Sequence, residues 1–335
     1  MSDYAVEINE ISKVFRIGSI VSGSRLVALD KVSLRMGSEE SSILSIVGES
    51  GSGKTTLAKI ILKIVEPTSG MVKLNGNDIY GKNRLKRLEF LQLVQPIFQN
   101  PYATFSARKP IYTYLYETAL NLRLAANRKE ASIRVSEALD SVGLDLKKVK
   151  GKYLMQFSGG EIQRISIARA LIAKPKLIVA DEPVSMIDAS MKMNIVNLFK
   201  ELKNKYKINF IYITHDLSTA YYVSDNIAIM YRGNIIEYGS SNEILETPQH
   251  PYTEMLIQLV PQIGKKWKEE IKLPEMEATE YSQEGCKFVK RCPVSREICS
   301  QFTPSQTVLK NNRKVMCFKY TDYELLSSEN KPTDD

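Results

Sequence analysis

The sequence predicts an α/β fold, and the prediction rests on three short apolar runs rich in branched side chains. These runs are SILSIV at 42–47, LIVA at 177–180 and INFIYIT at 208–214. Each run is continuous, and helix-like patterns separate them, as expected for parallel strands buried on both faces. Polar residues follow their carboxyl ends, which is where open α/β sheets bind ligands. We therefore expect a ligand crevice at that edge of the sheet.

The first strand leads into a phosphate-binding loop. GESGSGKT at 48–55 matches the pattern G-x-x-x-x-G-K-[ST], and TTLAKIILKIV begins a helix at its end. Glycines in such a loop let successive backbone N–H groups point at phosphate oxygens, and the helix N-terminus adds partial positive charge. Lys54 is expected to reach the β- and γ-phosphates and Thr55 to bind Mg²⁺. The residues predicted to hold the nucleotide are Gly48, Ser50, Gly51, Gly53, Lys54, Thr55 and Thr56.

A long helical stretch separates the first two strands. Residues 91–171 contain YLYETALNLRL and ASIRVSEALDSVGL, in which apolar residues recur at helical spacing. We interpret this stretch as a helical subdomain inserted into the α/β domain.

The second strand ends on two adjacent acids. LIVADEP at 177–183 places Asp181 and Glu182 directly after the apolar run. Adjacent carboxylates suit divided roles, one binding a metal ion and the other orienting an attacking water. We assign Asp181 to Mg²⁺ and Glu182 to the water. In isolation the pair could equally be a solvated loop, but the phosphate loop favours the catalytic interpretation.

A second anion site is predicted where another helix begins. In FSGGEIQRISIARAL at 157–171, Ser158, Gly159 and Gly160 offer a hydroxyl, backbone N–H groups and the positive end of a helix dipole. A compact domain has no obvious use for two such sites on one nucleotide. The second site therefore suggests a pocket that is completed on another subunit.

Together these motifs resemble the nucleotide-binding subunits of ABC transporters, whose signature motif stands where SGGE stands at 158–161. The resemblance implies a P-loop NTPase cassette with a mixed sheet core and an inserted helical subdomain. It also implies ATP and Mg²⁺ as ligands, held where two subunits meet head to tail. Further roles implied by the family are Mg²⁺ and water sensing by Gln99, γ-phosphate contact by His215, communication across the dimer by Asp188 and adenine stacking by Phe15.

Two residues depart from the family's common LSGGQ signature. This chain has Phe157 and Glu161 at those positions, which bears on the strength of the ATP site on the opposite subunit. Glu182 is intact, so this chain's own site is expected to hydrolyse ATP. Hydrolysis in isolation should be slow, because part of the charge stabilisation comes from the partner.

Other segments resemble the ATPases of oligopeptide and dipeptide importers in particular. IFQNPYATFSAR at 97–108 follows their corresponding stretch, and HPYTEMLIQLVP at 250–261 matches the helix after their cassette. The resemblance covers about residues 5–320 and suggests the second of two paired ATPase subunits. It implies a heterodimer with a related chain, two transmembrane permease subunits and an extracytoplasmic solute-binding protein. Peptide is the family's default cargo, and oligosaccharide is the alternative.

The C-terminal part of the chain is predicted to be a small Cys-rich extension. We place the cassette at 1–247, the extension at 248–320 and a disordered tail at 321–335. The cysteines Cys286, Cys292, Cys299 and Cys317 resemble the family's C-terminal pattern GCxFxxRCP…C…C. Four thiolates suit a [4Fe–4S] cluster, whereas the wide spacing disfavours zinc without excluding it. Disulfides or free thiols are the remaining alternatives, and any such staple would support an extension with little core of its own.

Charge and hydropathy predict a cytoplasmic protein, and the resemblance implies a peripheral position at the cytoplasmic face of the cell membrane. Its net charge of +8 comes from basic residues spread along the chain, so we expect no nucleic-acid partner. No apolar run approaches the length of a membrane span, and the N-terminus lacks a secretion signal. A soluble ABC ATPase unrelated to transport is the rival interpretation, but such proteins usually carry two cassettes or a long coiled-coil insertion.

Overall fold

The computed structural model describes residues 4–17, 24–37, 39–82, 84–259 and 284–321. All of the predicted tail except Thr321 lies outside these residues, as does most of the connection that precedes the cysteines. Within the described part of the chain, no helix is both long and apolar enough to cross a bilayer.

A mixed eight-stranded sheet forms the centre of the molecule. Its strands are β3 Ile43–Val47, β6 Val94–Ile97, β7 Leu177–Asp181, β8 Asn209–Thr214, β9 Asn226–Tyr231, β10 Asn234–Ser240, β11 Thr307–Val308 and β12 Lys314–Val315. The order is β11-β12-β10-β9-β3-β8-β7-β6; β9 to β6 run parallel, and β10, β12 and β11 pair antiparallel. Strands β3, β7 and β8 coincide with the three apolar runs, which confirms the predicted α/β fold.

A smaller antiparallel sheet covers one side of the phosphate-loop helix. Its strands are β1 Tyr4–Ile17, β2 Ser24–Gly37, β4 Ser69–Leu74 and β5 Asn77–Asp78, in the order β2-β1-β4-β5. Helix α1, Lys54–Ile61, lies between the two sheets. Its Leu57 and Ile60 are fully buried in one core with Ile8 of β1 and Ile46 of β3. This packing on two sides fixes the start of α1, where the phosphate loop ends.

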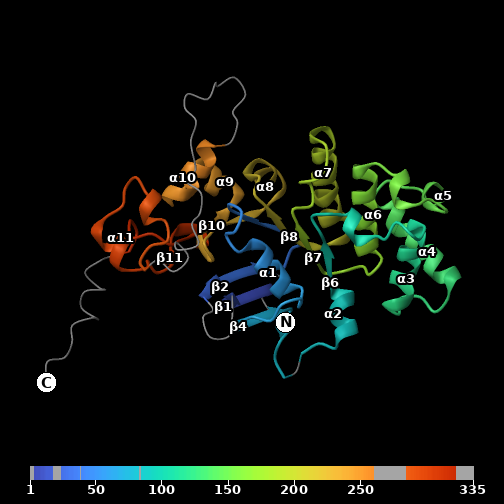
Figure 1. Cartoon of the computed structure of the whole chain (residues 1–335), viewed down its shortest axis with the longest axis horizontal. Helices are drawn as coiled ribbons and strands as arrows, with labels where there is room; N and C mark the ends of the chain where they lie inside the picture. The colour runs from blue at the N-terminus through green and yellow to red at the C-terminus, as the bar shows by residue number, and fades with distance from the viewer. Residues whose placement is uncertain (1–3, 18–23, 38, 83, 260–283, 322–335) are drawn as a thin grey trace.

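A second core extends from the other face of the main sheet into a group of helices. They are α3 Ile111–Asn121, α4 Arg128–Asp140, α5 Leu146–Val149, α6 Gly159–Leu171 and α7 Ala189–Tyr206, with the 3₁₀ turns η1 Tyr102–Thr104 and η2 Leu154–Gln156. Their buried side chains pack with Phe210 and Tyr212 of β8. Helices α3 to α6 lie together at one end of the long axis (Figure 1).

The stretch predicted to be helical from about residue 91 also contains a strand. Helix α2, Arg87–Leu93, is followed by β6, which pairs with β7 at the edge of the main sheet. The helical group therefore begins at α3. Four residues, one of them Pro96, are too few to show a strand period in the sequence.

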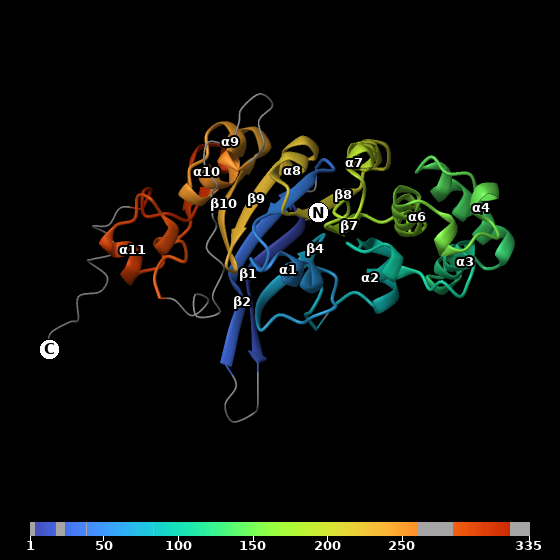
Figure 2. The ribbon, with the colours of Figure 1, turned by 45° about the horizontal axis from the view of Figure 1, so that its top comes forward.

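The C-terminal segment is joined to the cassette at several points. Its elements are α10 Pro251–Gln258, η4 Val289–Arg291, α11 Glu297–Gln301 and η5 Lys310–Asn312, which follow α8 Leu217–Val223 and α9 Ser241–Glu246. Strand β12 pairs with β10, and the buried Arg313 forms an ion pair with Glu237 at 2.6 Å. The segment lies at the opposite end from α3–α6 in both views (Figure 2). The cysteines are thus not the only link that holds the extension, and its boundary at residue 247 stays a prediction.

Candidate functional site

The phosphate loop has a backbone that only glycine can adopt at its end. Gly53, which caps the N-terminus of α1, has φ +109, and a Cβ there would lie 2.6 Å from the carbonyl oxygen of Ala28. A side chain would therefore strain the loop and displace its neighbour. The glycine keeps the backbone N–H groups at the start of α1 open to an anion.

The side chain of Lys54 is folded back over this loop. Its Nζ donates to the carbonyl oxygens of Gly48 at 2.7 Å and Glu49 at 2.8 Å. Burial lowers the pKa of Lys54, and the carboxylates of Glu182, Asp181 and Glu49 oppose that shift. The ammonium is thus held in place, with little contact with water, at the position where phosphate charge would gather.

The residues predicted to bind Mg²⁺ lie next to each other. The hydroxyl of Thr55 donates to Oδ1 of Asp181 at 3.4 Å. Burial is the main cause that raises the pKa of Asp181, and the neighbouring Glu182 raises it further. A hydroxyl beside a carboxylate with raised pKa fits a divalent cation, because the cation would supply the missing positive charge.

Glu182 and His215 form a contact between two neighbouring strand ends. Oε1 of Glu182 lies 2.7 Å from Nδ1 of His215, and the Glu182 side chain is only 13% exposed, against 62% for His215. Glu182 has φ +50, a conformation that is uncommon for a residue with a side chain and that clusters at functional sites. Its backbone N–H donates to Ile213 of β8 at 2.9 Å, which fixes it at the junction of β7 and β8.

These groups open onto one cavity of about 1170 Å³. Phe15 of β1 lies at its rim, partly exposed rather than in the core, and Gln99 follows β6. The predicted site residues that line the cavity are Phe15, Gly48, Ser50, Gly51, Gly53, Lys54, Thr55, Thr56, Gln99, Glu182 and His215.

The remaining predicted residues lie outside this cavity. Ser158 directly precedes α6, which begins with Gly159 and Gly160. Asp188 directly precedes α7, and its side chain makes no capping hydrogen bond; Ser158 and Asp188 are exposed. Asp181 does not line the cavity itself, but it accepts a hydrogen bond from Thr55, which does. The contact of the start of α6 with another subunit stays a prediction.

The departure at Glu161 has a local structural role. Its backbone N–H donates to the Ser158 hydroxyl at 3.3 Å, and its carboxylate accepts from the Ser158 N–H at 2.9 Å. This reciprocal pair is a capping box, which stabilises the first turn of α6. Glutamine can make the same pair, so the departure adds a charge without changing the cap.

Sequence reasoning missed three residues that contact the phosphate loop or belong to it. They are Glu49 within the loop, Tyr252 of α10 and Arg291 of η4. Glu49 stands at an unspecified position of the loop pattern, and Tyr252 and Arg291 lie more than 200 residues from it in the chain. No spacing rule could have found these contacts.

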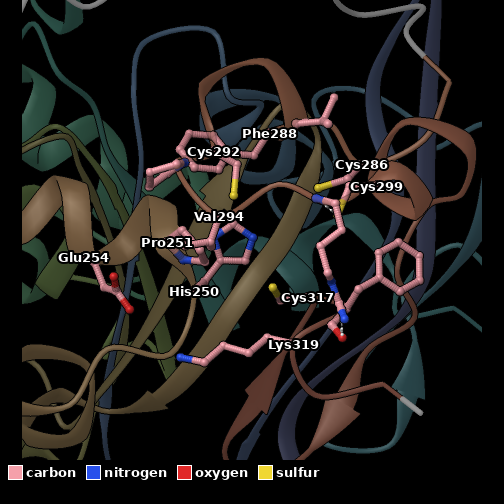
Figure 3. Close-up of a pocket in the computed structure, with 14 residues that line it drawn as sticks. His250, Pro251, Glu254, Cys286, Phe288, Cys292, Val294, Cys299, Cys317 and Lys319 are labelled. Carbon is pink, nitrogen blue, oxygen red and sulfur yellow. Dashed lines mark hydrogen bonds between the residues drawn. The ribbon is translucent and has the colours of Figure 1, made fainter. Parts of the chain in front are cut away.

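All four cysteines line a second cavity, of about 400 Å³ (Figure 3). They are free thiols, so the disulfide alternative does not describe this structure. Burial, with a smaller contribution from the other three thiols, raises the pKa of Cys286 to about 11. Among the described residues, no group of three or more His, Cys, Asp or Glu side chains is arranged to hold a metal ion.

Two family profiles match the chain. Residues 29–185 match the family described as "ABC transporter", and residues 236–299 match "Oligopeptide/dipeptide transporter, C-terminal region". The first covers the phosphate loop, the start of α6 and Glu182, and the second covers three of the four cysteines.

Curated relatives match over nearly the whole chain. The di/tripeptide transport ATP-binding protein DppF of Pseudomonas aeruginosa is 37% identical, with 87% of this chain and 89% of the relative covered. The oligopeptide transport ATP-binding protein AppF of Bacillus subtilis is 34% identical, with 94% and 97% covered.

Solved structures share the fold. CbiO1 of Clostridium perfringens, part of an ABC transporter complex, matches with a TM-score of 0.62 at 24% identity over 73% of this chain and 92% of that one. The ATP-binding cassette MJ0796, solved as a dimer with ADP and Pi, matches with a TM-score of 0.59 at 26% identity over 70% and 98%. The chain therefore belongs to the ABC transporter family, among the ATP-binding proteins that carry the oligopeptide/dipeptide transporter C-terminal region.

Proposed function

We propose that this chain is the ATP-hydrolysing subunit of an ABC importer that takes up oligopeptides or dipeptides. The observation that carries the proposal is the single cavity that brings Lys54, Thr55, Glu182 and His215 together. The peptide cargo follows from the relatives, which are named as di/tripeptide and oligopeptide transport ATP-binding proteins.

In this proposal the chain's own residues position the nucleotide and stabilise its charge. The loop N–H groups and Lys54 bind the phosphates, and Phe15 stacks on the base. Thr55 and Asp181, with Gln99, would hold Mg²⁺, and the ion would supply positive charge to the phosphate oxygens. Glu182 orients and deprotonates the attacking water, and His215 donates to the γ-phosphate. Little covalent chemistry is needed, because phosphoryl transfer depends chiefly on position and charge.

A second ATPase subunit would complete the site. In the proposed head-to-tail dimer, Ser158, Gly159 and Gly160 cap the nucleotide of the partner, and Asp188 connects the two sites. The exposure of Ser158 and Asp188 outside the nucleotide cavity supports this role, and the cassette MJ0796 is a solved dimer. We propose a related but different chain as the partner.

The membrane partners would be two permease subunits, with the chain peripheral at the cytoplasmic face. A cavity of about 640 Å³, lined by residues of β6, η1, α3 and α6, adjoins the nucleotide cavity at Gln99. A permease segment seated there would lie beside a residue of the ATP site. An extracytoplasmic solute-binding protein would select the cargo.

We also propose that the four cysteines hold a [4Fe–4S] cluster. Their sulfur atoms face a common space (Figure 3), and each accepts a hydrogen bond from a backbone N–H. The donors are Phe288 for Cys286, Val294 for Cys292, Lys319 for Cys317 and, at 3.5 Å, Arg296 for Cys299. When bound, the cluster would cross-link the extension.

Metal analysis of protein purified without oxygen tests the cluster. We expect a brown protein with iron and acid-labile sulfide, both lost in Cys286→Ser. A colourless protein that contains zinc would show that the cysteines bind zinc instead of a cluster. A colourless protein without metal would refute the proposal.

The function is tested by ATP hydrolysis in the reconstituted complex of both ATPases, the permeases and the binding protein. We expect stimulation by peptides. Stimulation by sugar oligomers instead would reassign the cargo to the oligosaccharide alternative. Hydrolysis indifferent to every cargo and to the permeases would favour a soluble ABC ATPase and refute the importer.

A further inference from the structure

An arginine of the cysteine segment, residues 286–317, forms a bidentate ion pair with the phosphate loop. The guanidinium of Arg291 donates from Nη1 to Oε2 of Glu49 at 3.0 Å and from Nη2 to Oε1 at 2.9 Å. The two residues are 242 positions apart in the chain. Both side chains are shielded, with 9% and 17% of their surface exposed. Parallel bonds of this kind fix orientation as well as charge.

Glu49 lies where a negative charge should oppose ATP. Its backbone carbonyl accepts from Lys54 Nζ at 2.8 Å, and its carboxylate is one of three that act on the charge of Lys54. Its backbone N–H donates to the hydroxyl of Tyr252 at 3.1 Å. A carboxylate in this position repels phosphate unless another group neutralises it. Arg291 is the group that pairs with it.

The position of Arg291 depends on the cysteine segment. The residue ends η4, which lies between Cys286 and Cys292, and the Val289 N–H donates to the carbonyl of Cys286 at 3.1 Å. The guanidinium also lies 5.7 Å from the ring centre of Phe288. The cysteines therefore form both ends of the segment that presents Arg291 to the loop.

We propose that Arg291 is a positioning residue for ATP: it neutralises and orients Glu49 in the phosphate loop, and through it the state of the cysteine site sets nucleotide affinity. The proposal rests on the proposed ATP-binding function and adds to it a control from the C-terminal extension. The role does not involve contact with the nucleotide.

Nucleotide titration of single and double variants of the full chain tests the role of charge. We expect Arg291→Gln to weaken binding of a fluorescent ATP analogue about tenfold, equivalent to about 1.4 kcal/mol. Arg291→Lys, which keeps the charge without the paired bonds, should recover most of that loss. Arg291→Gln with Glu49→Gln should return to within about threefold of the unmodified chain, because the repelling carboxylate is gone.

A matched control separates positioning from stability. Arg313→Gln breaks another buried Arg–Glu pair between the same extension and the cassette, but Glu237 is not part of the loop. It should lower the unfolding temperature and leave ATP affinity unchanged. The proposal is wrong if Arg291→Gln lowers ATP affinity no more than Arg313→Gln does. It is also wrong if adding Glu49→Gln to Arg291→Gln restores none of the lost ATP affinity, because Arg291 would then have only a structural role. An unmodified chain that does not bind ATP would instead refute the proposed function.

A separate experiment tests whether ATP affinity depends on the cysteine site. We expect Cys292→Ala to weaken ATP binding several-fold in the unmodified loop and to have little effect in the Glu49→Gln background. An equal loss in both backgrounds, or no loss in either, would refute the coupling. The readout is nucleotide affinity, so it does not depend on turnover.

Discussion

Replacing Glu182 by glutamine isolates one carboxylate of the ATP site. The amide has the same size as the acid and can still bond to Nδ1 of His215, which lies 2.7 Å from the carboxylate. Of the neighbouring carboxylates, Glu182 has the largest effect on the pKa of Lys54. Its removal lessens repulsion of phosphate at the loop. ATP binding should therefore be retained or become tighter.

The expected loss is confined to the chemical step. A positioned general base contributes about 100- to 10,000-fold to rate, which corresponds to about 2.7 to 5.4 kcal/mol of activation free energy. Glutamine cannot accept the proton of the attacking water, and the low exposure of the Glu182 side chain leaves little room for a solvent base to take its place. The full loss should thus be seen in kcat, with KM unchanged or lowered.

Steady-state phosphate release by the assembled transporter, combined with nucleotide titration, measures both quantities. The matched control is Glu137→Gln, the same change at a surface pair with Lys174 where both side chains are more than half exposed. The control should leave kcat and ATP affinity unchanged. Turnover of Glu182→Gln within tenfold of the unmodified protein would refute the role of Glu182 as base.

Three further substitutions follow from the packing and the loop. Arg313→Gln leaves the buried Glu237 without its ion pair, so urea unfolding should show a loss of about 3 to 5 kcal/mol; a loss under 1 kcal/mol would contradict this. Gly53→Ala places a Cβ against the carbonyl of Ala28, and nucleotide titration should show at least a roughly tenfold loss, whereas unchanged affinity would mean that the loop tolerates the strain. Phe288→Ala empties an aromatic cluster and should cost about 3 to 5 kcal/mol, with faster proteolysis of the extension; resistance equal to the unmodified chain would contradict it.

The phosphate loop, Glu182 and His215 could be predicted because each directly follows a strand that the sequence shows clearly. The phosphate loop is one continuous motif between a strand and a helix, and both flanking elements have clear periods. Glu182 and His215 follow two strands that were expected to run parallel, so their carboxyl ends meet when β7 and β8 are neighbours. Their contact needs no information beyond that topology.

Other features depend on contacts that no local pattern encodes. Phe15 could be placed near a strand end, but its position at the cavity rim requires the pairing of β1 with β2. The pair of Arg291 and Glu49 joins two loops across most of the chain. Strand β12 has only two residues, too few for a period of two to be recognised.

The pairing of β12 with β10 also matters for solubility. Without the C-terminal segment, β10 would be an edge strand of the main sheet, with a row of unsatisfied N–H and C=O groups open to other chains. Ile236 of β10 is buried in a core with Tyr252 and Phe288 of that segment, so the edge would expose an apolar side chain as well. A chain cut after residue 247 should therefore aggregate through strand-to-strand association, even though its ATP-binding motifs are intact.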